Sequence, residues 1–404
     1  MTTDLRSDDR TAAAANPLTT RLLVVLALLA AVAPFATDLY LSAFPRMADD
    51  LQTDATSIQL TLTAFLLGIA FGQLIFGPLS DRFGRRGPLI IGAAVFVLSS
   101  LAAAFAPTIA TLIVARLVQG LSGAAGMVLG RAVIADVARG QAAAKAFALM
   151  MVVSGVAPVL APLLGGLMVE GLGWRGVLGA LVVLAVVMLL SVLLAVPETL
   201  PRSARGGGEA RGWRALASRR YLGVTGAFVL AFSVMMAYIS ASPFVYQRLI
   251  GLGEVQYGLL FGLNALGLMV SSALAPKLTA RLGDAAVLRT GLLGVLLSCL
   301  VLLALVLTGA PAAWLPVPIF AAITSLGLVL GTSTAIALGA VTGAAGTASA
   351  VLGAAQFLLA AVVTPLVGLA GETSALPMAV VMSTAAVLAL VAFAASGAGR
   401  RPRV

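Results

Sequence analysis

The sequence predicts an all-α polytopic membrane protein, with twelve transmembrane helices in two six-helix halves. Of its 404 residues, 61% are hydrophobic and only 10% are charged, and the mean hydropathy is +1.09. Soluble domains carry about 25% charged residues, so a water-soluble fold of this length would lack polar surface. The apolar runs and the basic residues between them then give the number and orientation of the spans.

Twelve apolar runs are each long enough to cross a bilayer, which takes about 20 mostly apolar residues. The polar segment 1–20 precedes a run of full spanning length, so we expect the first run to remain as a helix rather than to be cleaved. The runs lie at 21–43, 57–79, 88–106, 108–137, 143–169, 175–196, 222–246, 254–278, 286–308, 313–340, 344–370 and 376–396.

Lysine and arginine are distributed unevenly between the loops. If both termini are cytoplasmic, the inside segments hold 20 of the 25 Lys and Arg residues, and the outside loops hold only Arg46, Arg175 and Arg248. Membrane proteins keep basic residues in their cytoplasmic loops. The bias predicts an even number of spans with both termini inside, and it explains the net charge of +10 without nucleic-acid binding.

A polar, Gly- and Arg-rich segment divides the chain into two sets of six spans. We interpret it as a flexible cytoplasmic linker, and two such halves around a central pathway are typical of transporters. The predicted units are a cytoplasmic tail at 1–20, an N-terminal bundle at 21–196, the linker at 197–220, a C-terminal bundle at 221–396 and a cytoplasmic tail at 397–404.

A short internal repeat supports the two halves. The loop after the second span contains Asp81-Arg82-Phe83-Gly84, and the loop after the eighth contains Ala280-Arg281-Leu282-Gly283. Both loops follow the second span of their half.

The residue inventory excludes several kinds of chemistry. There is no histidine and a single cysteine, Cys299, which rules out His-based zinc sites, Ser-His-Asp triads, His proton relays and internal disulfides. No Gly-x4-Gly-Lys-Ser/Thr loop for nucleotide occurs, which argues against an ATP-driven pump. The few acidic residues are scattered, which argues against a membrane enzyme. We therefore expect no enzymatic activity, no metal and no cofactor.

The loop after the second span carries a basic motif with one carboxylate, Gly77-Pro78-Leu79-Ser80-Asp81-Arg82-Phe83-Gly84-Arg85-Arg86. Gly84 permits a tight turn, and Asp81 can pair with arginine or with a helix N-terminus. A loop that only set orientation would have no use for this carboxylate. We predict a cytoplasmic gate in which Asp136 pairs with Arg82 or Arg86. Its residues are Gly77, Asp81, Arg82, Gly84, Arg85, Arg86, Arg131 and Asp136.

This loop matches the signature of the major facilitator superfamily in both residues and position. In the fourth span, Arg116-Leu117-Val118-Gln119-Gly120 resembles the Arg-x-x-Gln-Gly motif of the drug–proton antiporters in that superfamily. The fifth span resembles the antiporter motif that ends Gly-Pro-x-x-Gly-Gly, with Ala161 in place of one glycine. Prolines bend this helix and glycines permit close contact, although ordinary small-residue packing is the alternative. The matching residues are Gly155, Pro158, Pro162, Gly165 and Gly166.

Four further stretches resemble the bicyclomycin/chloramphenicol-resistance branch of bacterial efflux proteins. They lie at 38–45, 72–86, 197–200 and 238–247. The resemblance covers nearly the whole chain, without a diagnostic motif in spans 9–12. It implies the major facilitator fold, the bacterial inner membrane and proton-coupled export of lipophilic drug-like compounds by alternating access. The implied partners are a small lipophilic substrate, protons and the bilayer, with the protein acting as a monomer.

Two charges lie deep in the predicted bundle. Asp38 lies ~25 Å from the cytoplasmic start of span 1, and Arg116 lies ~12 Å from the outer end of span 4. Charges at such depth usually face a cavity or a partner. We predict that Asp38 exchanges protons and that Arg116 is its partner. Alternatively, Arg116 has only a structural partner and Asp38 lies in water at the outer end.

The C-terminal half has almost no deep charge, and its polar and aromatic residues suit neutral or weakly polar lipophilic compounds. An anion site would need more arginines. A facilitator for sugars or osmolytes, a channel and a receptor are the alternatives, and proton-coupled drug efflux would discriminate between them. These polar residues could also serve only interhelical hydrogen bonding. The candidate substrate-binding residues are Tyr40, Gln119, Tyr238, Ser240, Phe244, Tyr246, Gln247, Asn264 and Gln356.

Overall fold

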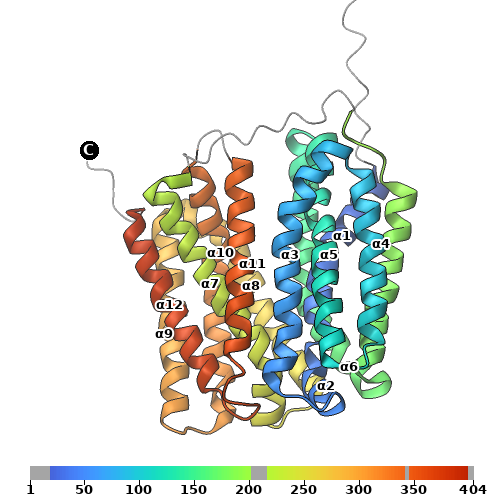
Figure 1. Cartoon of the computed structure of the whole chain (residues 1–404). Helices are drawn as coiled ribbons and strands as arrows, with labels where there is room; N and C mark the ends of the chain where they lie inside the picture. Colours follow the sequence, from blue (N-terminus) through green and yellow to red (C-terminus); the bar gives the residue numbers. More distant parts are fainter. Residues whose placement is uncertain (1–18, 202–215, 342–344, 399–404) are drawn as a thin grey trace, which may run out of the picture.

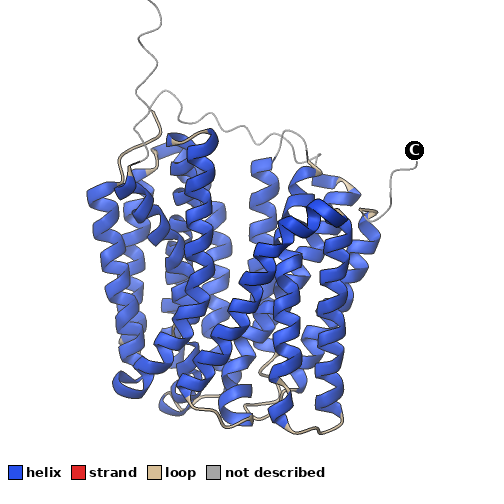
Figure 2. Cartoon of the chain, turned by 180° about the vertical axis from the view of Figure 1, so that it is seen from behind, coloured by secondary structure: helices blue, strands red, loops and turns tan. Residues whose placement is uncertain are grey.

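The computed structural model describes residues 19–201, 216–341 and 345–398, and in these ranges the chain is helical without strands (Figure 2). Most of the predicted tails and most of the predicted linker lie outside them. The long helices are α1 (Thr20–Asp38), α3 (Ala55–Phe83), α4 (Arg86–Ala104), α5 (Ile109–Val137), α6 (Gly140–Ala195), α7 (Arg219–Phe244), α8 (Glu254–Leu282), α9 (Asp284–Leu307), α10 (Pro316–Gly339), α11 (Ala345–Leu366) and α12 (Leu376–Ser396).

Four shorter helical segments connect or extend these helices. They are η1 (Leu41–Ala43), α2 (Phe44–Asp50), the π-helical turn η4 (Val245–Leu249) and η5 (Ala312–Trp314). The first span was expected to continue to residue 43, but α1 ends at Asp38, and the chain then turns into η1 and α2.

The described chain has twelve membrane-crossing helices. Eleven segments are long and apolar enough to cross a membrane, and one of them, α6, has 56 residues. A single helix of that length would measure ~84 Å, far more than a bilayer. Gly173 interrupts α6 with φ 65° and ψ 178°, so α6 consists of two successive helices. The predicted fold class is thereby confirmed, and the loop expected between spans 5 and 6 is this glycine break.

The helices form two groups that lie side by side. Figure 1 shows α1 to α6, coloured blue to green, on one side and α7 to α12, coloured yellow-green to red, on the other. Between the groups, α6 packs against α8 and α3 packs against α11. The start of α1, the end of α6, the start of α7 and the end of α12 lie at the same end of the bundle (Figure 1), which we call the terminal end, and the other is the opposite end.

The short sequence repeat corresponds to the same backbone turn in each half. Gly84 ends α3 with φ 95° and ψ 169°, and Gly283 ends α8 with φ 84° and ψ 150°. Each glycine N–H donates to the carbonyl four residues earlier, that of Ser80 or Thr279. A positive φ of this size favours glycine, which explains why both loops contain glycine at this position.

Candidate functional site

Arg116 is a fully buried cation of α5. Its guanidinium lies between the rings of Tyr40 and Phe65, 4.3 Å from each centroid. It donates to the Ala36 carbonyl at 2.8 Å and to the side-chain oxygen of Gln119. Desolvated cation–π contacts are worth about 2 kcal/mol each. Arg116 therefore ties α5 to the last turn of α1.

The arginine has no ionic partner in the described part of the chain, and its Nε atom has no hydrogen-bond partner there. Gln119, which accepts from Arg116, donates onward to the Ser100 hydroxyl of α4 at 2.7 Å. Arg116 and Gln119 therefore form a polar chain through α1, α5 and α4.

Asp38 is the last residue of α1 and is 4% exposed. Within the described residues no basic side chain lies at ion-pair distance from it. Arg116 binds the carbonyl of Ala36, two residues before Asp38, but does not form an ion pair with Asp38. The Asp38 carboxylate instead interacts electrostatically with Tyr238 and Tyr257 of the second half. Its role in proton exchange stays a prediction.

The second half presents a buried cluster of tyrosines to this region. The Asn264 side-chain amide donates to the hydroxyls of Tyr238 at 2.8 Å and Tyr246 at 3.3 Å. The Tyr257 hydroxyl is hydrogen-bonded to that of Ser242 at 3.3 Å. The cluster joins α7, η4 and α8 and offers mostly apolar surface with a few hydroxyl groups.

The remaining candidate substrate residues are mostly buried where the two halves meet. Phe244 packs against Phe44, with ring centroids 6.2 Å apart, and Gln247 donates to the Ser42 carbonyl at 3.1 Å. The Ser240 hydroxyl donates to a carbonyl of α11, that of Thr364. Tyr40 is hydrogen-bonded to Thr61 at 3.2 Å, and Gln356 lies half-buried on α11. Their part in substrate binding stays a prediction.

Two interior residues were missed by the sequence reasoning. Tyr257 lies near the start of the eighth apolar run and is buried, with its hydroxyl bonded to that of Ser242 at 3.3 Å. Gln59 is a buried amide near the start of α3 that donates to the Ser240 carbonyl at 3.2 Å, joining the halves. An amide side chain inside an apolar run was the available signal for Gln59.

Glycines of α6 allow backbone-to-backbone contact with α1 and α8. A Cβ atom on Gly165 would overlap the Leu39 carbonyl oxygen, and one on Gly258 would lie 2.7 Å from Cα of Leu163. Gly166 meets the backbone of α8 in the same way, and Pro158 and Pro162 lie in the same segment. In contrast, nothing lies within 4 Å of a Cβ on Gly155.

A charged cluster at the terminal end is centred on Arg85. This arginine donates to Asp81 and, at 3.0 Å, to Asp136. Burial lowers the pKa of Arg85, but the bonds to Asp136 and Asp81 outweigh it and raise that pKa above the usual value. The partner of Asp136 is thus Arg85, rather than Arg82 or Arg86 as expected, because the Gly84 turn directs Arg85 toward α5.

The segment after α6 completes this cluster. Glu198 accepts from the backbone N–H groups of Arg85 and Arg86, and the Thr199 hydroxyl donates to Asp136 at 2.9 Å. These bonds cap the start of α4 and tie the beginning of the linker segment to the loop. Among the residues that the structure describes, the Arg131 side chain bonds a carbonyl of its own helix, that of Met127, and does not join the cluster.

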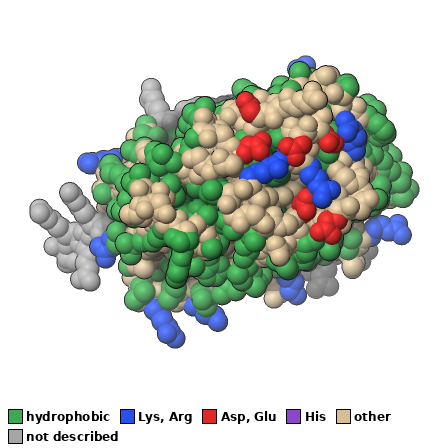
Figure 3. Space-filling view, turned by 90° about the horizontal axis from the view of Figure 1, so that it is seen from below, with side chains coloured by type: hydrophobic (Ala, Val, Ile, Leu, Met, Phe, Trp, Pro, Cys, Tyr) green, Lys and Arg blue, Asp and Glu red, His purple; other side chains and the backbone are tan. Residues whose placement is uncertain are grey.

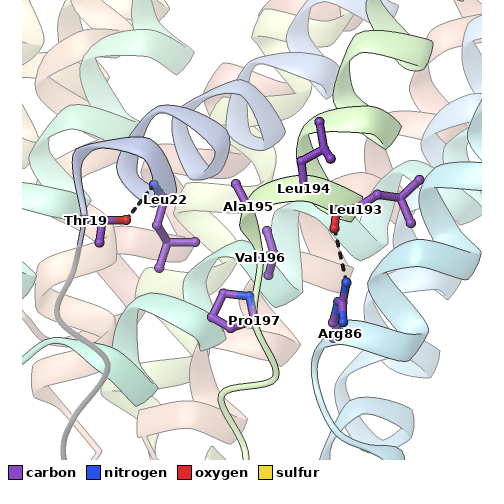
Figure 4. Close-up of a pocket in the computed structure, with 8 residues that line it drawn as sticks. All are labelled: Thr19, Leu22, Arg86, Leu193, Leu194, Ala195, Val196 and Pro197. Atoms are coloured by element: carbon purple, nitrogen blue, oxygen red, sulfur yellow. Dashed lines mark hydrogen bonds between the residues drawn. The ribbon is translucent and has the colours of Figure 1, made fainter.

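A hollow of about 350 Å³ lies beside this loop at the terminal end (Figure 4). Arg86 borders it and donates to the Leu193 carbonyl at 3.1 Å. Its other walls are Thr19 and apolar residues from the end of α6, the segment after it and the start of α1. None of the buried residues around Asp38 lines it, so it is separate from the candidate substrate site.

Ion pairs join the two halves at the opposite end. Arg46 of α2 pairs with Glu254 of α8 at 2.6 Å, and Arg248 of η4 pairs with Asp49 of α2 at 2.6 Å and with Glu372 at 3.1 Å. Figure 3 shows acidic and basic side chains next to one another on this face. The short helix α2 therefore contributes one cation, Arg46, and one anion, Asp49, to ion pairs with the other half.

Twelve membrane-crossing helices in two halves, with buried polar residues between them, define a secondary transporter. The chain belongs to the major facilitator superfamily, whose family model matches residues 26–365. It is thus a multi-pass membrane transporter of small molecules and not an enzyme.

Its relatives include bacterial proteins named for drug resistance. YdgK of Bacillus subtilis, named an uncharacterized MFS-type transporter, is 36% identical over 91% of this chain and 93% of its own length. The bicyclomycin resistance protein homolog of Haemophilus influenzae is 28% identical over 92% and 94%. The multidrug resistance protein MdtL of Escherichia coli is 28% identical over 57% and 60%. The resemblance to the drug-antiporter branch is thereby confirmed.

Solved structures show the same fold at low sequence identity. A D-xylose-proton symporter superposes with a TM-score of 0.74 at 17% identity, covering 91% of this chain and 96% of that one. A bacterial homologue of the lysosomal transporter Spinster, inward-facing and occupied, gives a TM-score of 0.72 at 17% identity, covering 93% and 95%.

Proposed function

We propose that this protein exports lipophilic drug-like compounds across the bacterial inner membrane in exchange for protons, with Asp38 as the proton site. The observation that carries the proposal is the burial of Asp38 where the halves meet, without a basic partner in the described chain. Such a carboxylate is costly when ionised, so a conformational change that alters its surroundings would load or release a proton. Arg116 would assist by holding the end of α1 through Ala36.

The loop charges orient the protein in the membrane. The terminal end carries the arginine-rich loop after α3, and basic loops stay in the cytoplasm. With both termini inside, the ion pairs of α2 would join the two halves at the outer side and hold it closed. Transport by alternating access then requires these pairs to break while the halves rock about the interior. The Arg85 cluster lies within one half at the inner side and is the proposed cytoplasmic gate.

The surroundings of Asp38 favour neutral or weakly polar lipophilic cargo. The tyrosine cluster offers aromatic surface with few hydrogen-bonding groups, and pockets of this kind suit drug-like molecules. The names of the relatives from Haemophilus influenzae and Escherichia coli point to the same cargo class. Each chain contains both halves of the transporter, so we propose that a single chain carries out transport as a monomer.

The proposal is tested with a panel of toxic lipophilic compounds in a bacterial host lacking its own pumps. Expression should raise resistance to some of them and lower their accumulation in cells, and a protonophore should remove both effects. The empty membrane is the control. Protonophore-insensitive uptake of a sugar or osmolyte, with no change in drug accumulation, would instead identify a facilitator.

A further inference from the structure

The end of the short helix α2 is held by the turn between the fifth and sixth spans of its own half. The indole N–H of Trp174 donates to the carboxylate of Asp50, the last residue of α2, at 2.8 Å. Trp174 directly follows Gly173, the residue that breaks α6 into two helices. Trp174 is only 2% exposed, so its ring has a fixed position. The end of α2 is therefore bonded to a rigid group of the first half.

Arg175 supports the same contact. Its guanidinium lies over the Trp174 ring, 4.1 Å from the centroid, and one of its nitrogens is 3.9 Å from an Asp50 carboxylate oxygen. Arg175 also donates to the Ala106 carbonyl, between α4 and α5, at 3.4 Å. The residue pair Trp174 and Arg175 thus joins the end of α2 to the rest of the first half.

The first turn of α2 contacts the same part of α6. Arg46 donates to the Val169 carbonyl at 3.2 Å, and the same side chain pairs with Glu254 of the second half. Val169 precedes the break in α6 and Trp174 follows it, so residues 169–175 contact both ends of α2. This segment of α6 therefore determines where α2 lies.

The carboxylate that Trp174 holds is adjacent to one that pairs with the second half. Asp49 pairs with Arg248 of η4 at 2.6 Å, and Asp50 follows it in the same helix. Neighbouring residues of one helix have a fixed rise and rotation between them. A displacement of Asp50 would therefore move Asp49 away from its partner.

We propose that Trp174 is a positioning residue that places α2 so that Arg46 and Asp49 reach their partners in the second half. Partly exposed ion pairs are weak because long side chains lose freedom when they form. A helix that is already fixed loses less freedom on pairing, so pre-organisation strengthens the pairs. This role rests on the proposed function, because it requires the ion pairs of α2 to close the outer side.

Trp174→Phe should shift the protein toward an open outer side. Phenylalanine keeps an aromatic ring beside Arg175 but cannot donate to Asp50. The ratio of closed to open molecules should fall about fivefold, as expected for the loss of one hydrogen bond. Asp50→Ala should have the same effect, and the double variant should add nothing, because both changes remove the same bond. Asp50→Asn keeps an acceptor for the indole N–H and should remain largely closed.

The experiment measures the distance between the two halves at the opposite end. The sole native cysteine, Cys299, is buried, so Leu172→Cys and Thr308→Cys, at exposed positions, can carry spin labels on the full-length protein. The distance distribution in lipid vesicles at fixed pH gives the fractions of closed and open molecules. Trp314→Phe is the matched control, because this tryptophan also lies at the opposite end but is 61% exposed.

A second background tests whether Trp174 acts through the ion pairs. Arg46→Gln with Arg248→Gln removes the attraction on both sides of α2, so this double variant should itself be largely open. Adding Trp174→Phe to it should cause little further opening. A general loosening of the fold would instead open the outer side equally in both backgrounds, and this result would overturn the positioning role.

The outcomes separate the role of Trp174 from the proposed function. Opening in Trp174→Phe and Asp50→Ala, with Trp314→Phe unchanged, would support the positioning role. Asp50 is largely exposed, so its variant tests the bond even if Trp174→Phe does not fold. If the variant without the ion pairs opens but Asp50→Ala stays closed, Trp174 does not position α2. If the variant without the ion pairs also stays closed, α2 does not close the outer side.

Discussion

The way Arg116 is held explains how the interior tolerates a permanent cation. A bare charge in an apolar interior is prohibitively costly. Here two aromatic faces, a backbone carbonyl and the Gln119 amide surround the guanidinium. A lysine could not replace it, because a compact ammonium cannot stack between two rings and bond both acceptors at once. The guanidinium is thus stabilised by neutral groups and needs no carboxylate as a partner. Asp38 therefore stays available to exchange protons.

Asp38→Asn should abolish drug export against a gradient while the protein still folds and inserts. The amide keeps the size of the side chain but cannot bind or release a proton. Efflux from energised vesicles or cells should fall to the level of the empty membrane. Asp284→Asn, at an exposed carboxylate in the first turn of α9, is the control. If the Asp38→Asn protein still builds a drug gradient, Asp38 is not the coupling site.

Among the helices, the fifth-span glycines set how closely α6 packs against the end of α1 in its own half and against α8 in the other half. Gly165 and Gly166 face backbone atoms of Leu39 and Glu254, and Gly258 returns the contact from α8. Such contacts have no room for a methyl group. The prolines nearby remove backbone donors, so the segment combines close packing with a helix that bends easily. This combination suits a surface on which one half rocks against the other.

Gly165→Ala should destabilise the protein, and Gly155→Ala should not. The added methyl group at position 165 would overlap the Leu39 carbonyl, and overpacking of this kind costs about 1–3 kcal/mol. At position 155 the space is open, so we expect a change within about 0.5 kcal/mol. Thermal unfolding in detergent and drug efflux measure both effects. Equal stability of the two variants would contradict the close packing of α6.

The elements were largely predictable from the sequence, and their mutual contacts were not. Hydropathy located all twelve spans because each must match the bilayer. The angular direction of a side chain after a turn depends on backbone angles, so Arg85 could not be distinguished from Arg82 or Arg86. Tyr257 was missed because its hydroxyl partner, Ser242, lies on another helix, and hydropathy carries no information on such contacts.

At the scale of the whole molecule, α2 acts as a bridge across the opposite end. Its Arg46 and Asp49 reach carboxylate and guanidinium groups of the other half. These pairs are partly exposed, and such pairs contribute about 0–1 kcal/mol each. A few weak pairs can hold one state without preventing the change to the other, as alternating access requires.

Arg46→Glu should open the outer side, and the double exchange Arg46→Glu with Glu254→Arg should close it again. The single variant places two carboxylates where an ion pair was, and like charges repel. The spin-label distance between Leu172→Cys and Thr308→Cys should lengthen in the single variant and return in the double variant. The single variant Glu254→Gln, which removes attraction without adding repulsion, should have a smaller effect. An unchanged distance in Arg46→Glu would show that this pair does not close the outer side.

Glu372 should make closure of the outer side sensitive to external pH. Burial raises the pKa of Glu372 above its usual value, although Arg248 opposes the shift. Asp49 and Asp54 also face this carboxyl and raise its pKa further. Opening would return it to water and to its ordinary pKa, so the closed state binds the proton more tightly.

By linkage, the closed state gains stability as the pH falls. This contribution is complete below the ordinary pKa of glutamate and is lost as the pH rises through the raised pKa. An acidic exterior would then favour closure after a proton has entered. In the Asp38→Asn background, the distance between the two spin labels should still depend on pH above the ordinary pKa of glutamate. Adding Glu372→Gln should remove that dependence, because the amide does not titrate. If the pH response were the same with and without Glu372→Gln, another group would control closure of the outer side.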